Sequence, residues 1–157
     1  MWGEFVSGSN NSLEWRGGTA IDEMALDAVE TQLGVRFPED YRACVLVNDG
    51  GAPDKTEFSY LHSDLGEFGG CFGSLLRLGT QGPDSLLWTL EAISDRLPAR
   101  VIPFMEDPGG DCACFDFRTA GSKDGAPPLV YWTHDCLPER SLTFLAGNFA
   151  EFLEMLT

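Results

Sequence analysis

The fold of this chain is decided by residues 19–51, which read TAIDEMALDAVETQLGVRFPEDYRACVLVNDGG. Thr19, with Asp22 three residues later, resembles a capping box that starts a helix. Gly34 predicts the end of this helix, because glycine enters the left-handed backbone region at little cost. Between them, apolar residues recur at spacings of three and four, which is the period of a helix with one buried face: Ile21, Met24, Ala25, Ala28, Val29 and Leu33.

A second helix is predicted to open at Phe37-Pro38. Proline suits a first helical turn because its missing N–H would have no partner there. Glu39 and Asp40 follow, where the helix dipole favours negative charge. Residues 48–51, Asn-Asp-Gly-Gly, are a strong stop signal. The pattern therefore predicts a helical hairpin in the first third of the chain.

The residues before the hairpin, 1–18, are rich in glycine, serine and asparagine. We expect a loose N-terminal arm there, with a short strand as one option. The length of 157 residues suits one domain with one core, so we expect residues 1–157 to form a single domain.

Beyond the hairpin the pattern favours strands. Residues 129–133 are apolar on both faces, which predicts a central strand with Trp132 and Tyr131 on it and Trp132 largely buried. A closing helix is predicted over residues 145–156, with Phe149 and Phe152 on its apolar stripe. Shorter elements are expected as strands at 58–61, 74–78, 101–104 and 112–117, a glycine-rich loop over 62–74 and a helix over 85–94. This order predicts an α+β fold: a helical hairpin, a mainly antiparallel sheet and a C-terminal helix packed on the sheet.

The chain is strongly acidic. Ten Lys and Arg residues against 25 Asp and Glu residues give a net charge of −15 at pH 7, and the acids are spread along the chain rather than gathered in a tail. Such a surface repels nucleic acid and anionic lipid and attracts basic proteins. We therefore expect a protein partner, with no binding of nucleic acid or membrane; solubility alone is the alternative explanation of the charge.

The location is expected to be cytoplasmic. The first residues lack the basic start and the long apolar run of a signal peptide, and no stretch approaches the ~20 apolar residues that span a bilayer. The five cysteines are odd in number and follow no regular framework, so reduced thiols are the simpler interpretation.

Signatures of catalysis are missing. The chain has two histidines, His62 and His134, and no HExxH, GxSxG or phosphate-binding loop. We therefore predict no enzyme and no cofactor. A Cys–His pair, such as Cys71 or Cys136 with His134, stays open as an alternative without a local signature.

Two clusters could suggest a metal but have the wrong spacing. Cys112 and Cys114 are separated by one residue, whereas a zinc knuckle has two. In a strand these two thiols share one face, where buried and unreactive cysteines are expected. Asp107 and Asp111 miss the spacing of a calcium loop; we expect Asp107 to cap its turn and Asp111 to bond backbone N–H groups. No metal is predicted at either place.

Four motifs carry a resemblance to a known family. The first is the hairpin, with Glu30, Leu33, Gly34, Phe37, Pro38, Asp40 and Tyr41, closed by Asn48-Asp49-Gly50-Gly51. The second is Ile102-Pro103-Phe104 followed by Asp107-Pro108-Gly109-Gly110-Asp111. The third is residues 129–135, with Trp132, His134 and Asp135, and the fourth is Ala146, Phe149, Glu151, Phe152 and Leu153. In this order, over about residues 20–156, they resemble the SUKH superfamily, which includes Smi/Knr-type cell-wall regulators and many bacterial immunity proteins.

The resemblance implies an antiparallel sheet flanked by helices, and no enzymatic activity. It also implies that bacterial members neutralise a cognate toxin, often a nuclease, by binding it. The motif residues are implied to keep the fold rather than to mark a toxin-binding surface. The chain departs from the family pattern at Thr133, which stands in place of an acid, and at Asn148, which stands in place of serine.

Three functions follow as hypotheses: an immunity protein that binds a basic toxin, a regulatory scaffold domain without a toxin, and a Cys/His hydrolase. For a binding function, residues 62–84 are the candidate patch, because the motifs explain them least and loops on a rigid scaffold often carry specificity. The segment mixes acids with aromatic residues, which could form an anchor inside a polar rim: Asp64, Glu67, Phe68, Phe72 and Asp84. The alternative is that these aromatics pack beneath the loop.

Overall fold

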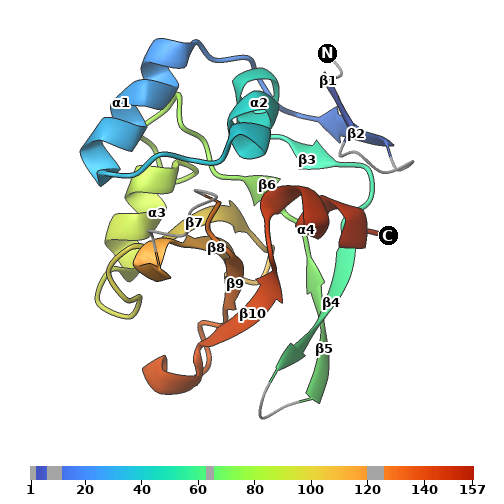
Figure 1. Ribbon diagram of the computed structural model, residues 1–157, viewed down its shortest axis with the longest axis vertical. Helices are drawn as coiled ribbons and strands as arrows, with labels where there is room; N and C mark the ends of the chain where they lie inside the picture. Colours follow the sequence, from blue (N-terminus) through green and yellow to red (C-terminus); the bar gives the residue numbers. More distant parts are fainter. Residues whose placement is uncertain (1–2, 7–11, 63–65, 120–125) are drawn as a thin grey trace.

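A computed structural model describes residues 3–6, 12–62, 66–119 and 126–157 (Figure 1). Its main sheet has five strands, and every neighbouring pair is antiparallel. The strand order is β10 (Leu142–Ala146), β9 (Leu129–Trp132), β8 (Cys112–Asp116), β7 (Val101–Glu106) and β6 (Ser74–Leu75). This confirms the predicted α+β class with a mainly antiparallel sheet.

Strand β9 lies inside this sheet, between β8 and β10. All four of its residues are buried, and Trp132 is only 2% exposed. The prediction of an interior strand with a buried Trp132 is therefore confirmed. The physical reason is that a strand with neighbours on both edges and cores on both faces can hold apolar side chains on both faces.

One face of the main sheet carries the larger core. Its centre is a set of aromatic rings from different elements: the Tyr41 ring lies 5.0 Å from Phe115 and 5.5 Å from Phe149. Phe104 packs against both Phe149 and Phe152, so the closing helix covers the sheet as predicted. Aromatic edge-to-face contacts of this kind add to the free energy gained from burying apolar area.

The other face carries a smaller core. Cys112 and Cys114 point to it from β8 and pack with Val130 and Trp132 of β9. Ile93 and Leu97 cover them from the α3 side. Because alternate residues of a strand face opposite ways, Ala113 and Phe115 belong to the larger core instead. The expected shared face of the two cysteines is thus confirmed.

Four α-helices are described: α1 (Glu23–Leu33), α2 (Glu39–Asn48), α3 (Leu86–Ile93) and α4 (Phe149–Met155), with short 3-10 helices at Phe117–Thr119 and Pro138–Arg140. Gly34 ends α1 with φ of 70°, as predicted. The start differs: Asp22 is the N-cap, and its side chain accepts a hydrogen bond from the Ala25 N–H at 2.8 Å. Thr19 instead pairs with the backbone of Asp49. Within the described residues, no helix is long and apolar enough to cross a membrane.

In the described part of residues 1–18, two strands lie where we expected a loose arm with a short strand as one option. β1 (Gly3–Val6) and β2 (Ser12–Arg16) pair antiparallel, and β2 also pairs antiparallel with β3 (Ala52–Pro53). Leu13 and Trp15, two residues apart on β2, are both buried. This segment forms a strand because its apolar residues alternate with polar ones, so that the apolar side chains lie together on one buried face.

The predicted glycine-rich loop over residues 62–74 is also corrected. β4 (Glu57–His62) pairs with β5 (Gly66–Cys71) in a hairpin. Gly70 is needed because a Cβ there would lie 2.3 Å from the ring of Phe58 on the opposite strand. The glycines that suggested a loop thus make room for a bulky partner ring, a known use of glycine within strands.

The end of the chain differs in one boundary. We expected the last helix to begin at residue 145, but residues 142–146 are strand β10 and α4 begins at Phe149. Asn148 caps α4 by accepting a hydrogen bond from the Glu151 N–H at 2.8 Å. Asparagine and serine are both good N-caps, so Asn148 performs the same capping role as the serine of the family pattern.

Candidate protein-binding surface

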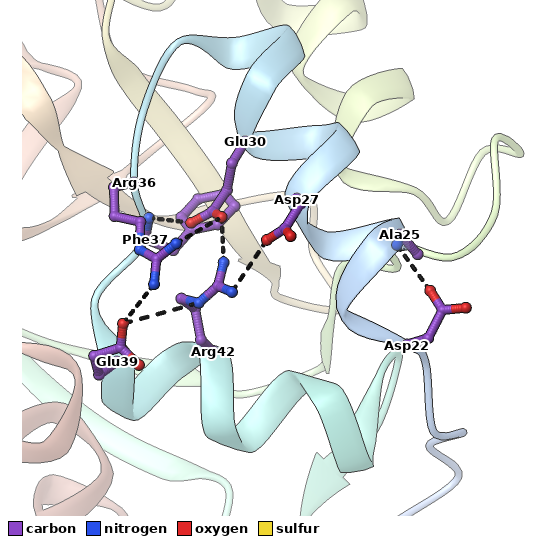
Figure 2. A network of polar contacts seen from close by, with 8 residues as sticks. All are labelled: Asp22, Ala25, Asp27, Glu30, Arg36, Phe37, Glu39 and Arg42. Atoms are coloured by element: carbon purple, nitrogen blue, oxygen red, sulfur yellow. Dashed lines mark hydrogen bonds and ion pairs between the residues drawn. The ribbon is translucent and has the colours of Figure 1, made fainter.

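The opening motif is built around a buried carboxylate on α1 (Figure 2). Glu30 accepts a hydrogen bond from the Phe37 N–H through Oε2 at 2.6 Å. Its other oxygen forms an ion pair with the guanidinium of Arg42 on α2, and Arg42 also reaches Asp27 at 3.2 Å. The side chains of Glu30 and Arg42 are each only 7% exposed. One carboxylate therefore ties α1, the connecting loop and α2 together.

A second buried carboxylate lies at the end of the hairpin. Asp49 accepts hydrogen bonds from the N–H groups of Leu78 at 2.7 Å and Gly79 at 3.1 Å. Burial raises the pKa of Asp49, although these two hydrogen bonds oppose the shift. Arg77 donates to the backbone oxygen of Asp49 at 3.0 Å. The motif residues at this end thus fasten α2 to the segment that leads into α3.

The Asp-x-Gly-Gly-Asp motif has the roles expected from the sequence. Asp107 accepts a hydrogen bond from the N–H of Gly109, within its own turn. Asp111 accepts from the His134 N–H at 3.0 Å and also faces the His134 ring at 2.6 Å, and the other ring nitrogen lies 3.1 Å from Asp135. Among the described residues, no group of three or more His, Cys, Asp or Glu side chains is placed to hold a metal ion.

The structure brings one cysteine beside a histidine, but the pair is not one of those that we named from the sequence. The contacts of the His134 ring described above are to carboxylates, not to the thiol of Cys71 or Cys136. Cys136 instead places its sulfur 3.8 Å from Nε2 of His62, a histidine that is 2% exposed. The sequence offered no sign of this pairing, because the two residues lie on separate segments. A buried histidine of this kind is poorly accessible to a substrate.

Three thiols lie in environments that suppress the thiolate. Burial raises the pKa of Cys44 to about 12 and that of Cys112 to about 12. Burial also raises the pKa of Cys114, with the neighbouring Cys112 and Asp116 acting in the same direction. Because the thiolate is the reactive form, these three cysteines should be inert in the folded protein.

This leads to a labelling prediction. In the native protein at pH 8, iodoacetamide should leave Cys44, Cys112 and Cys114 unmodified, whereas Cys71 and Cys136, which are partly exposed, remain accessible. In denaturant all five should react. Peptide mass spectrometry after timed labelling makes the measurement, and rapid native modification of Cys112 or Cys114 would show that this core opens readily.

The predicted binding patch is only partly presented at the surface. Glu67 and Phe68 lie on β5, both exposed, with Phe68 46% exposed and its ring packed 6.2 Å from that of Tyr60. Leu61 of β4, opposite Glu67 in the register, is 73% exposed. We call these three residues the hairpin patch: Leu61 and Glu67 share one face of the hairpin, and Phe68 lies on the other face with Tyr60.

The other predicted patch residues are placed elsewhere. Phe72 is 1% exposed and packs against Trp15 and Phe152, so it is a core residue and a correction to the predicted anchor. Asp84 lies just before α3 and pairs with Arg77 at 3.1 Å, and Figure 1 shows α3 and the β4–β5 hairpin well apart. Asp64 lies outside the described residues.

Several arginines lie in ion pairs with neighbouring acids. Arg77 is paired with Asp84, Arg96 with Asp95 and Arg118 with Asp116. The pair with Arg118 holds the pKa of Asp116 below its usual range. Because such cations are locally neutralised, the net charge of −15 is carried by the remaining acids.

One comparison with known proteins bears on this arrangement. The model of the SMI1 / KNR4 family (SUKH-1) matches residues 20–155, which is most of the chain. No curated protein matches the chain. The matched span begins just before α1 and ends with α4, so it contains the hairpin network, the main sheet and the closing helix.

Proposed function

Because the chain belongs to the SMI1 / KNR4 family (SUKH-1), we propose that it is a non-enzymatic protein-binding domain of the immunity type, which neutralises a basic toxin by binding it. The observation that carries the proposal is the net charge of −15, spread over the chain while arginines are paired with neighbouring acids. A negative field of this extent favours a basic partner.

The physical logic concerns both affinity and speed. A toxin that acts on nucleic acid needs a basic surface to hold phosphates. An acidic inhibitor is steered onto that surface by long-range attraction, which raises the association rate. Speed matters for a protective protein, because a free toxin does damage until it is bound. Charge complementarity also discourages acidic proteins from occupying the same surface.

The hairpin patch is our proposed first contact with the toxin. Leu61 and Glu67 place apolar area and charge side by side on one face of the hairpin, and Phe68 adds an exposed ring on its other face. Exposed aromatic residues inside a polar rim are a common composition of binding hot spots. Asp64, which lies outside the described residues, remains a candidate from the sequence alone.

The test compares two charge reversals that alter the net charge equally. Glu67→Lys should slow association with the basic protein that co-purifies with this chain, and weaken the salt dependence of that rate, more than Glu23→Lys, a change at an exposed residue on α1. Phe68→Ala should instead speed dissociation. Surface plasmon resonance at two salt concentrations gives both rates. If Glu67→Lys and Glu23→Lys behave alike and Phe68→Ala changes nothing, the hairpin patch is not the contact.

A regulatory scaffold domain is the second candidate, and the family match favours it as well, since the family includes Smi/Knr-type regulators. The two candidates differ in their genetic setting. A toxin gene directly upstream supports the immunity function, whereas its absence supports the scaffold.

A further inference from the structure

In the part of the chain that the structure describes, strand β5 has a neighbouring strand on one side only, which is β4. An open strand edge presents backbone N–H and C=O groups that can pair with another chain. Natural proteins protect such an edge with proline, with lysine, with a bulge or with a covering segment. β5 reads GEFGGC and pairs with β4 without a bulge, so its sequence and register lack the first three of these protections.

The hydrogen bonds of the hairpin show which backbone groups of β5 point away from β4. The N–H of Phe72 donates to the backbone oxygen of Thr56 at 2.7 Å, so this pair bonds across the hairpin. Bonded and non-bonded pairs alternate along antiparallel strands. The register then places the backbone groups of Glu67 and Gly69 on the outer edge.

This outer edge is covered at one end and open at the other. The N–H of Cys71 also points outward, and it donates to a carboxylate oxygen of Asp107 at 3.3 Å. From Gly66 to Gly69 the residues are exposed. Within the described residues, no hydrogen bond is made by the outward backbone groups of Glu67 and Gly69. These groups are therefore available to another chain.

The side chains along the open edge indicate the chemistry of what it pairs with. Neither β4 nor β5 contains lysine or arginine, and their acids, Glu57 and Glu67, are both exposed. A strand added beside β5 places its residues alternately on the face of Glu67 and on that of Phe68, which is 46% exposed. Opposite charges across such a pair are favourable, and like charges are not. A second copy of the chain would bring another Glu67 and another net charge of −15 to this edge, so a basic segment fits it better.

We propose that an extended segment of the basic partner adds a strand to the open edge of β5, through backbone hydrogen bonds to Glu67 and Gly69. Along that segment Lys or Arg, opposite Glu67, alternates with apolar residues that pack on Phe68. In strand addition the main chain supplies affinity and alternate side chains supply specificity. This inference rests on the proposed function, because it states how the basic partner is held at the hairpin patch.

Gly69→Pro is the first test, with Gly69→Ala as the matched control. Proline removes the outward N–H and keeps the hydrogen bonds to β4, whereas alanine keeps that N–H as well. A Cβ at residue 69 meets only the backbone oxygen of Phe58, at 4.0 Å, so the fold does not need glycine there. The probe is the basic protein that co-purifies with the wild-type chain from its native host. Gly69→Pro should raise its Kd at least about tenfold, and Gly69→Ala at most about twofold. Equal thermal midpoints verify that both variants are folded.

Hydrogen exchange of the wild-type complex gives a second test, which needs no variant. The amides of Glu67 and Gly69 should exchange at least about tenfold more slowly in the complex than in the free chain. The protected segment of the partner should be extended, with Lys or Arg alternating with apolar residues. Unchanged exchange at both amides, or a helix as the protected segment, would contradict strand addition.

The outcomes separate this inference from the function on which it rests. If wild type binds a basic protein, but Gly69→Pro binds it as well as Gly69→Ala does, the edge is not the docking site, although the binding function stands. If wild type retains no basic protein, the proposed function fails, and the inference fails with it. If sedimentation shows a wild-type dimer that Gly69→Pro converts to monomer, a second copy occupies the edge, which contradicts the basic segment.

Discussion

Glu30→Ala is expected to lower the free energy of unfolding by about 3 kcal/mol, because it leaves a buried guanidinium without its main partner. The change removes the carboxylate that pairs with Arg42 and also the acceptor of the Phe37 N–H. Asp27, whose side chain is 58% exposed, still forms an ion pair with Arg42 in this variant. We therefore expect a loss of stability at the lower end of the range for removing one partner of a buried ion pair. Urea denaturation followed by circular dichroism measures the loss.

The control is Glu39→Ala, in the same network but at the surface. Glu39 is 80% exposed and pairs with Arg36, itself 66% exposed, so its loss should cost less than about 1 kcal/mol. Replacing both Glu30 and Arg42 by leucine and methionine should recover much of the stability, since a buried ion pair often exchanges for apolar residues at little cost. If Glu30→Ala is no more destabilising than Glu39→Ala, the buried pair does not hold the hairpin together.

Trp132→Ala should be at least as damaging, with a loss of about 3–5 kcal/mol. Its side chain fills the smaller core between the main sheet and α3, together with Cys112, Cys114 and Val130. The guanidinium of Arg96 lies 5.2 Å from the centre of its ring and would lose that contact as well. The denaturation midpoint of the variant should therefore fall clearly below that of wild type.

Trp88→Ala is the natural comparison for this second change. Both variants lose an indole, but Trp88 is half exposed, so its removal should shift stability by less than about 1 kcal/mol. A midpoint that hardly moves for Trp132→Ala would mean that the smaller core contributes little to folding. Equal losses for the two tryptophans would contradict the burial pattern.

The sequence predicted an element correctly where the local preference of its residues matches their burial in the fold. Gly34 stops α1 because the left-handed conformation at that position suits glycine, and the apolar run of β9 reflects cores on both of its faces. The start of α1 was harder to predict, because Thr19 and Asp22 can both cap a helix. Which of them does so depends on the pairing of Thr19 with Asp49, a contact 30 residues away.

The errors among the strands share a physical cause, which is that a strand depends on partners distant in the sequence. The glycines of β5 suggested a loop because glycine has a low propensity for strands. The segment is a strand because it pairs with β4, where Gly70 lies opposite Phe58. Likewise, Leu145 fits the apolar stripe of a helix as well as it fits β10, and only pairing with β9 distinguishes them. The burial of Phe72 follows from the same hairpin and could not be derived from its neighbours in sequence.

The candidate surface was predictable to a smaller degree. Glu67 and Phe68 were identified by composition, and the structure places both at the surface. The open edge of β5 was missed because residues 62–74 were expected to form a loop. Which part of a strand edge stays open depends on segments distant in the sequence, as the contact between Cys71 and Asp107 shows.

The most direct test of the central claim is the salt dependence of binding to the partner that co-purifies with this chain from its native host. If an acidic surface steers the chain onto a basic protein, the association rate should fall about tenfold or more as ionic strength rises from about 0.01 M to 0.5 M, while the dissociation rate changes much less. An association rate that does not depend on salt, or a co-purifying partner that is acidic, would contradict the account.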